Sequence, residues 1–403
     1  MKFGQRVSIR EKIRSPEFAR SLWSPTRVEW RDVIEMLITM SKRYTFNKLA
    51  MMKIQIWIAW DVINESEAIL KMKEKIGELE QLKTDPNQHD KDYDDDIQHL
   101  KTEIESSRLT IAALREIIDG IVWRYFNYNR ALLYTVANKQ PIDIVASDKG
   151  LRNSLMEFAD ILINKGHNAI LNDISNFLRI GDVTNIKPDG SIEFIEVKSS
   201  KKKGARFRRQ EERMQQTVEF FNTGVKELDK EKFIITESNI KQKNYLPQLK
   251  DSILRARKVG YDSILIGNHL IVETTDFSKL DDSEKAKQYF ESKHKSVKEK
   301  WGKNGDRIYP CFSIEKLDAP KNFAPYTIFP FNDDIIADIL MGKIWILYKL
   351  NNSEIIRILE RAGWKLVDSF DNIPEEVIRN TDIEDLILYK VRKGSLTVSI
   401  PPP

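Results

Sequence analysis

The sequence predicts a multidomain protein that combines helices and sheets, of the α/β (α+β) class. Residues 44–82 and 97–137 carry apolar residues at helical spacing, which predicts two long helices. The middle of the chain alternates amphipathic helices with short strands, and about the last hundred residues mix the two. At 403 residues the chain is long enough for two or three domains.

Composition narrows the class of protein. The chain is 41% hydrophobic and 31% charged, and no uninterrupted apolar run reaches the length of a membrane span, so no membrane partner is expected. The N-terminus lacks the apolar core of a signal peptide. Cys311 is the single cysteine, which excludes disulfides and cysteine zinc clusters and favours a reducing cytoplasm. A net charge of +4 is too small to indicate a partner.

Residues 1–145 are predicted to form an all-α domain. A first helix is expected to begin at Ser24-Pro25, because proline is favoured in the first helical turn. The two long helices, 44–82 and 97–137, are separated by a polar, Asp-rich break. Each would extend roughly 60 Å. We therefore expect an antiparallel hairpin, a coiled-coil-like arm suited to self-association or to a protein partner.

Two parts of this arm allow a functional and a structural interpretation. Residues 121–134 interleave aromatic side chains with arginines, which suits either stacking on nucleic acid or burial against a neighbouring domain, and burial is favoured. The aspartates between Asp90 and Asp95 lack the spacing of a calcium loop, so a solvated tip is expected.

Residues 146–275 are predicted to form a central domain. A helix capped by Ser147-Asp148 ends at Gly166, and three strands follow: 168–171, one leading into Asp182, and 192–198. Pro188-Asp189-Gly190 predicts the turn between the second and third strands. A basic loop, a helix at 210–222 and a strand at 233–236 complete the order αβββαβ.

A further helix and hairpin follow before residue 275. The helix is stopped at Gly260, and the hairpin turns at Gly267-Asn268. Residues 276–303 are charged and suit a surface helix. The rest of 276–403 is predicted to be a small α+β domain without a catalytic pattern.

The third strand of the central domain carries charge within an apolar run. Side chains alternate along a strand, so Glu196 and Lys198 are expected on one face and Ile195 and Val197 on the other. A carboxylate and an ammonium are costly to bury unless something compensates them. A divalent metal ion and a phosphate would do so.

Asp182 together with Glu196-Val197-Lys198 resembles the PD-(D/E)xK nuclease superfamily, which has the restriction-endonuclease-like fold. The resemblance covers residues 146–275, although Gly181 stands where the family has proline. It implies metal-dependent hydrolysis of phosphodiester bonds. Asp182 and Glu196 would bind Mg²⁺, for which Mn²⁺ is a substitute, and the Val197 carbonyl would be a third ligand. Lys198 would hold the attacking water and stabilise the transition state.

Other residues of the domain have two interpretations each. Glu157 either contributes to a second metal site or is a solvated carboxylate on a helix face. Gln216 and Phe220 look like the Q-x-x-x-Y pattern of some superfamily members, with Gln210 and Arg213 competing for that role. A basic loop begins three residues after Lys198 and is favoured for phosphate binding over mere solubility. Its nucleic-acid-binding candidates are Lys201, Lys202, Lys203, Arg206, Arg208 and Arg209, with Arg213 beyond them.

These observations favour a cytoplasmic, Mg²⁺-dependent nuclease, with DNA preferred over RNA as substrate. An endonuclease in bacterial or phage defence or restriction fits this architecture. Three alternatives remain open: an RNA-cleaving nuclease, a nucleic-acid-binding scaffold without turnover, and a coiled-coil interaction protein whose middle domain supports the arm.

Overall fold

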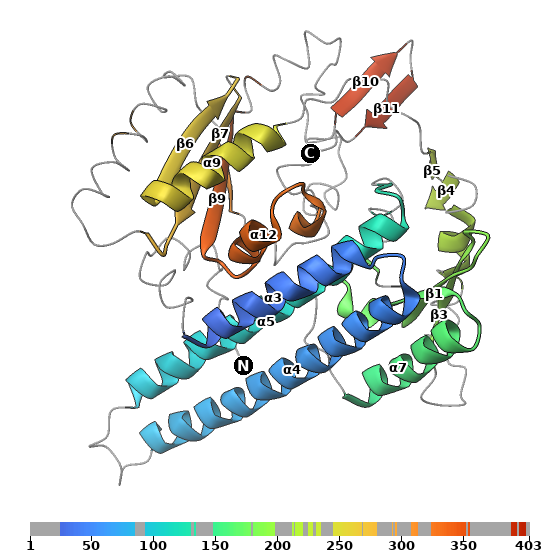
Figure 1. Ribbon diagram of the computed structural model, residues 1–403, viewed down its shortest axis with the longest axis horizontal. Coiled ribbons are helices and arrows are strands. Elements are labelled where there is room, and N and C mark those ends of the chain that lie inside the picture. Colours follow the sequence, from blue (N-terminus) through green and yellow to red (C-terminus); the bar gives the residue numbers. More distant parts are fainter. Residues whose placement is uncertain are drawn as a thin grey trace. The chain divides into compact units, whose positions relative to one another are not determined.

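The structure is a computed structural model, shown in Figure 1. It describes residues 25–84, 93–129, 148–178, 180–197, 214–220, 245–267, 269–279 and 324–351, short strands at 225–228, 231–234, 308–312, 388–392 and 395–399, and the isolated positions 133, 212, 292, 295 and 354. Its described part combines helices with antiparallel sheets, which confirms the α+β class. Among the described helices, none has both the length and the apolar character needed to cross a bilayer.

The chain divides into two compact units. The first contains the described residues from 25 to 234 together with residues 325–328, and the second contains the other described residues from 245 onward. The predicted domains, 1–145, 146–275 and 276–403, have different boundaries. They differ because sheet pairing and helix docking join segments that sequence composition separates.

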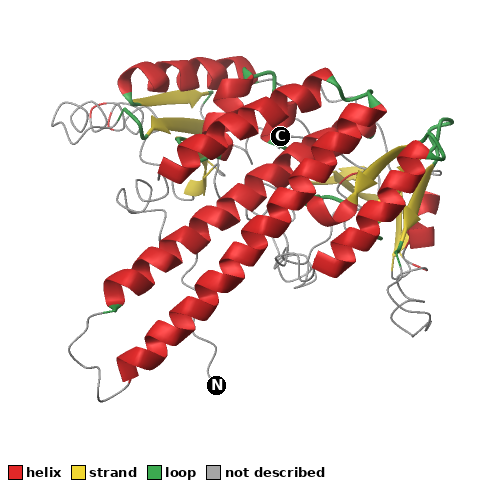
Figure 2. Ribbon diagram, turned by 60° about the horizontal axis from the view of Figure 1, so that its bottom comes forward, coloured by secondary structure: helices red, strands yellow, loops and turns green. Residues whose placement is uncertain are grey.

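The first unit is built on three helices, α3 (Pro25–Arg43), α4 (Lys48–Thr84) and α5 (Asp94–Tyr125). Figures 1 and 2 show α4 and α5 side by side as the predicted antiparallel hairpin. A small cluster of Leu79, Tyr93 and Ile97 closes its far end. The second helix ends at Tyr125, twelve residues earlier than predicted. The chain leaves it because Asn127 and Tyr128 adopt left-handed backbone conformations, with φ of 50° and 58°.

The aromatic part of the arm is mostly buried, as the structural interpretation predicts. Trp123 is 4% exposed and Phe126 is 6% exposed. Trp123 makes an edge-to-face contact with Phe177, with ring centroids 5.7 Å apart. Among the described aromatic residues of this stretch, Tyr128 alone is classed as exposed, so these side chains form core and not a stacking surface.

An antiparallel meander follows helix α7 (Asp148–Ile163). Its strands are β1 (Asn168–Leu171), β2 (Val183–Ile186) and β3 (Ile192–Ile195), in the spatial order β1-β2-β3. The predicted turn is present, because the Gly190 N–H donates to the Lys187 carbonyl oxygen and Gly190 has a φ of 83°. β2 and β3 differ from the predicted strands: Asp182 precedes β2 instead of ending a strand, and Glu196 and Val197 follow β3.

The last strand of the predicted αβββαβ order does not join the meander in the described structure. Residues 214–220 are helical, and β5 (Glu231–Ile234) lies close to the predicted 233–236. β5 pairs with β4 (Val225–Leu228) in a separate two-stranded sheet. The short spacing between β4 and β5 favours this local hairpin over a distant partner strand.

The second unit is an antiparallel sheet of four strands in the order β6-β7-β9-β8. The strands are β6 (Tyr261–Ile266), β7 (Leu270–Asp276), β8 (Ile308–Phe312) and β9 (Ile344–Asn351). The helices of this unit are α9 (Leu246–Val259), which ends at Gly260 with φ of 91° as predicted, and α12 (Asp333–Leu340). Because β7 pairs with β9 along seven residues, the hairpin that we assigned to the nuclease-like domain belongs to this sheet. A separate two-stranded hairpin is formed by β10 (Leu388–Arg392) and β11 (Ser395–Ser399).

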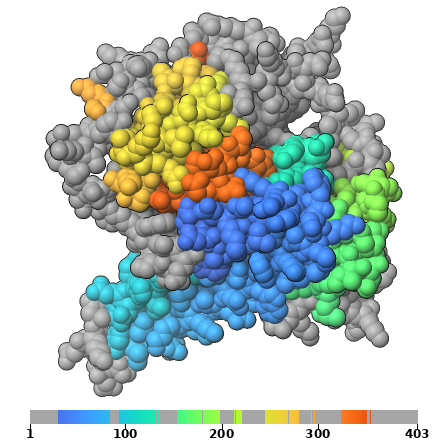
Figure 3. Space-filling view, viewed as in Figure 1, coloured from blue at the N-terminus to red at the C-terminus, as the bar shows by residue number. Residues whose placement is uncertain are grey.

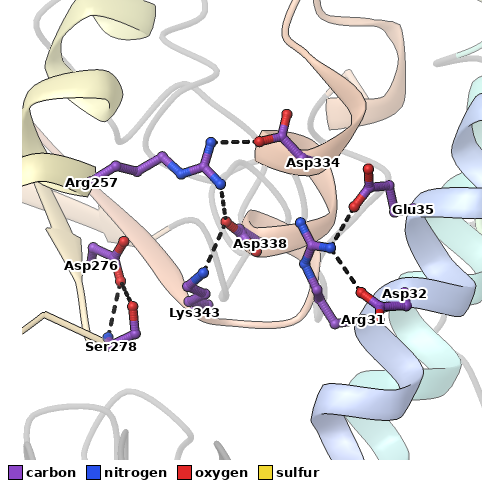
Figure 4. Close-up of polar contacts among 9 residues, drawn as sticks. All are labelled: Arg31, Asp32, Glu35, Arg257, Asp276, Ser278, Asp334, Asp338 and Lys343. Atoms are coloured by element: carbon purple, nitrogen blue, oxygen red, sulfur yellow. Dashed lines mark hydrogen bonds and ion pairs between the residues drawn. The ribbon is translucent and has the colours of Figure 1, made fainter.

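Two buried acidic side chains in the second unit, Asp338 and Glu273, have basic partners, and Figure 4 shows those of Asp338. Asp338 is fully buried and accepts from the Arg257 guanidinium at 2.9 Å and from Lys343 Nζ at 3.3 Å. Arg257 also contacts Asp334 at 2.6 Å. Glu273, 7% exposed, pairs with Lys349 at 2.7 Å. These pairs compensate the cost of burying charge.

Candidate functional site

Asp182 and Glu196 come together at one end of the meander. Val183, the first residue of β2, pairs with Ile195, the last residue of β3. Asp182 directly precedes β2 and Glu196 directly follows β3, and the Asp182 N–H donates to the Ile195 carbonyl oxygen at 2.8 Å. The two carboxylates are close enough for the charge of Glu196 to raise the pKa of Asp182. The structure thus joins two acids that the sequence separates by a turn.

The Asp182 carboxylate also takes part in the backbone pairing. Its Oδ2 accepts the N–H of Val197 at 2.5 Å, in place of a strand carbonyl. This bond fixes the segment that follows Glu196. Asp182 is only half-buried, so solvent reaches part of the residue.

Gly181 sets the direction in which the chain enters Asp182. Its φ is 69°, and a Cβ there would lie 2.9 Å from the Ile195 carbonyl oxygen and 3.2 Å from Met214 Sδ. Proline fixes φ near −65°, so the family's proline does not fit this backbone. Glycine therefore stands at position 181 because the backbone there needs a positive φ, which the sequence alone did not show. The position of that Cβ also identifies Met214, from the helix at 214–220, as a side chain packed against the site.

Asn172, directly after β1, binds the backbone that leads into Asp182. This residue is buried, and its N–H donates to the Asp182 carbonyl oxygen at 2.9 Å while its Nδ2 donates to the Ile180 carbonyl oxygen at 2.9 Å. Its Oδ1 accepts from the Thr184 hydroxyl at 2.8 Å. With donors and acceptor all engaged, the Asn172 side chain fixes the backbone of residues 180–182.

The electrostatics of the site are those of crowded acids. The pKa of Asp182 is raised to about 7. Burial is the largest cause, the negative charges of Glu196 and, more weakly, Asp173 add to it, and the hydrogen bond from the Val197 N–H acts against it. Like charges at close range disfavour ionisation of both groups. A cation between these carboxylates would remove that penalty.

Asp173 is a residue that sequence reasoning missed. It follows β1 in the short helix η2 (Asn172–Ile174), and its Oδ2 accepts from the Ser154 hydroxyl of α7 at 3.2 Å. Its negative charge adds a small contribution to the raised pKa of Asp182. An Asn-Asp pair directly after a buried strand was the available signal, because polar residues at strand ends gather at one sheet edge.

Asp119 of α5 anchors the loop that leads from η2 toward Asp182. Its carboxylate accepts hydrogen bonds from the Ser175 hydroxyl at 2.8 Å and from the Phe177 backbone N–H at 3.3 Å. It also accepts two from Asn176, one from the backbone N–H at 2.8 Å and one from the side-chain Nδ2 at 2.6 Å. Asp119 is fully buried, and this burial raises its pKa to about 6 despite those four donors. A single carboxylate within the apolar run Ile117–Trp123 was the signal for this role.

Gln55 of α4 docks the helical hairpin on the edge of the sheet. Its amide nitrogen donates to the Ala169 carbonyl oxygen at 3.0 Å, and its amide oxygen accepts the Leu171 N–H at 2.9 Å. This side chain thereby supplies the hydrogen bonds that a neighbouring strand would give to β1. It explains why the arm and the meander form one unit despite their predicted separation.

Two further predicted site residues face other surroundings. Glu157 lies 3.6 Å from Lys165 Nζ at the end of α7, which favours its interpretation as a helix-face carboxylate. Gln216 is exposed, about 160° round the helix from Met214. Phe220, 1% exposed, is a core residue. The metal-binding role of Glu157 and the site contact of Gln216 stay predictions that this geometry does not favour.

The other predicted site residues lie outside the described part of the chain. They are Lys198, Lys201, Lys202, Lys203, Arg206, Arg208, Arg209, Gln210 and Arg213.

Two carboxylates fit a magnesium ion that keeps most of its water ligands. Mg²⁺ prefers one or two carboxylates with waters and phosphate oxygens, and Asp182 with Glu196 supplies that donor set. Within the described ranges, no three histidine, cysteine, aspartate or glutamate side chains are grouped closely enough to hold a metal ion.

Comparison of the chain with protein-family models, with curated proteins and with solved structures found no match in any of the three.

Proposed function

We propose that this protein is a Mg²⁺-dependent nuclease of the PD-(D/E)xK type that hydrolyses phosphodiester bonds in DNA. The observation that carries the proposal is the proximity of Asp182 and Glu196, which flank the paired strand ends Val183 and Ile195, together with a raised pKa at Asp182. Crowded carboxylates at an accessible sheet end are costly for stability and useful for holding a divalent cation.

In this proposal each residue has a defined task. Asp182 and Glu196 hold Mg²⁺, whose role is to neutralise phosphate charge and to acidify a bound water. The Val197 carbonyl is a third ligand, and Lys198 holds the attacking water and stabilises negative charge in the transition state. The hydrogen bond from the Val197 N–H to Asp182 keeps these two segments in register. Asn172 and Gly181 keep the backbone of Asp182 in place.

Cleavage assays with matched variants test this proposal. Purified protein is incubated with circular DNA, linear DNA and RNA in Mg²⁺, Mn²⁺ or EDTA. We expect cleavage of DNA with either metal and none in EDTA, and loss of cleavage in Asp182→Asn, Glu196→Gln and Lys198→Ala. Asp189→Asn is the control, because Asp189 is an exposed acid in the turn of the same meander and holds only Ser191.

The outcomes separate the candidate functions. Cleavage that survives both Asp182→Asn and Lys198→Ala would exclude this site. Cleavage of RNA but not DNA would correct the substrate, and binding without cleavage of any substrate would favour the scaffold interpretation. Circular DNA as substrate distinguishes an endonuclease from an exonuclease, because it has no ends. A place in bacterial or phage defence and a cytoplasmic location belong to the same proposal.

A further inference from the structure

A row of exposed apolar side chains lies on the outer face of α4. Leu49, Trp57 and Trp60 are 64%, 47% and 39% exposed, and Phe46, just before the helix, is 81% exposed. Steps of three and four residues place Leu49, Lys53, Trp57 and Trp60 on one face of the helix. The opposite face holds core residues, including Ile54 and Ile58, and Gln55, which binds β1. Figure 3 shows α4 at the surface of its unit.

The charge along this face has one sign. From residue 36 to residue 60 the chain contains no aspartate or glutamate but has four basic residues, Lys42, Arg43, Lys48 and Lys53. Of these, Lys48 donates to the Gly166 carbonyl oxygen, whereas Arg43 and Lys53 are exposed. Beyond Trp60 the helix becomes acidic, beginning with Asp61 and Glu65. The aromatic and basic part of α4 therefore has a sharp boundary at one end.

We propose that Phe46, Lys53, Trp57 and Trp60 form a stacking face that binds single-stranded nucleic acid. Indole and phenyl faces stack on bases of any sequence, and interleaved cations contact the phosphates. A second copy of the chain fits this face poorly, because a two-fold contact would bring the Arg43 and Lys53 side chains of both copies together. A polyanion with aromatic bases matches both properties of the face.

The stacking face lies in the same unit as Asp182, since Gln55 of the same helix binds β1. It would hold a strand without reading its sequence, while the corner of Asp182 and Glu196 acts on the phosphate. The choice of nucleic acid as the partner rests on the proposed nuclease function, but the binding itself does not require cleavage. The inference thus adds a substrate class, strands with accessible bases, to that function.

Binding of a fluorescein-labelled oligo(dT) in EDTA tests the stacking face in the absence of cleavage. We expect Trp57→Ala and Trp60→Ala each to raise the Kd by about fivefold or more, and Trp57→Phe to retain most of the affinity. Lys53→Ala should reduce the dependence of Kd on salt between about 50 and 200 mM. Leu70→Ala is the matched control: this residue is 52% exposed on the acidic part of the same helix and should leave the Kd unchanged.

Three results would overturn the stacking face. The first is an unchanged Kd for the Trp57→Ala/Trp60→Ala double variant with wild-type helicity. The second is a loss of binding in Leu70→Ala equal to that in the tryptophan variants. The third is a dimer, seen by sedimentation, that the double variant abolishes. The last would show that a second copy covers the face.

The same assay distinguishes failure of this inference from failure of the nuclease proposal. Oligonucleotide binding that requires Trp57 and Trp60 in a protein that cuts nothing would retain the stacking face and exclude the nuclease. Cleavage that requires Asp182, in a protein whose tryptophan variants bind the oligonucleotide normally, would support the nuclease proposal and exclude the stacking face.

Discussion

Acidic side chains have neighbours of opposite charge in one unit and of like charge in the other. In the second unit, Asp338 is fully buried and lies between Arg257 and Lys343, so each charge has an opposite partner. In the first unit, the neighbours that raise the pKa of Asp182 are two more carboxylates, Glu196 and Asp173. A neutralised cluster stabilises a fold, whereas a cluster of like charges weakens it unless a ligand binds. The contrast supports the proposal that the reactive site lies in the meander and not in the larger sheet.

The largest expected effect is on activity at the crowded acids. Asp182→Asn should lower the rate of cleavage by about a thousandfold or more, because one of the two proposed metal ligands is lost. The same variant should be more stable than wild type above pH 7, by about 1–2 kcal/mol after allowance for the solvent that reaches this half-buried group.

The sign of that stability change follows from the raised pKa of about 7. The folded state holds the Asp182 proton more tightly than the unfolded chain, so stability is lost as pH rises toward 7. Urea unfolding of both proteins at pH 5 and pH 8 measures the difference. A variant less stable than wild type at pH 8 would contradict the view that this acid is held at a cost.

The opposite result is expected at the neutralised acids. Asp338→Ala should destabilise the protein by about 3–5 kcal/mol, because it leaves Arg257 and Lys343 beside an empty position. Thermal unfolding measures the loss, and DNA cleavage by the folded variant should be retained. A gain in stability would show that Asp338, like Asp182, is held in the folded state at a cost, and would contradict the comparison.

Asp119 is an intermediate case, a buried acid that is satisfied by neutral donors. Its pKa of about 6, against 3.8 unperturbed, means that the folded state takes up a proton between about pH 4 and pH 6. Stability from this group therefore falls as pH rises through that window, by up to about 3 kcal/mol. In Asp119→Asn this pH dependence should be absent, which urea unfolding at a series of pH values measures. An identical pH profile would exclude Asp119 as its source.

The smallest effect is expected at a pair whose acid is not fully buried. On α3, Arg31 contacts Glu35 at 2.5 Å and the exposed Asp32 at 2.9 Å (Figure 4). Because solvent reaches both acids and Arg31 keeps Asp32 as a partner, Glu35→Ala should change the free energy of unfolding by about 0.5 kcal/mol or less. This variant is the baseline for Asp338→Ala in the same unfolding experiment. A change as large as that of Asp338→Ala would show that ion pairing alone, without burial, explains the contrast.

Local sequence pattern predicted most elements correctly. The start of α7, the whole of β1, the turn at Gly190 and the end of α9 at Gly260 were all predicted, because caps, periodicity and glycine conformations act over a few residues. The grouping of Asp182 with Glu196 as one candidate site came from the resemblance to the PD-(D/E)xK superfamily, and a single turn separates the two strands that these acids flank. Apolar periodicity predicted that Trp123 and Phe126 would be buried.

Contacts between distant segments were decided only by the tertiary structure. Nothing near β7 indicated that it would pair with β9, some seventy residues away, and this pairing moved the domain boundary. The roles of Gln55 and Asp119 also depend on partners more than fifty residues away. Positive φ at Gly181 became visible only beside the Ile195 carbonyl. The sequence by itself thus determined the local elements and the acids, because those depend on short-range sterics and periodicity. The fold decided which backbone groups and charges surround those acids, because long-range pairing depends on the sum of many contacts across the chain.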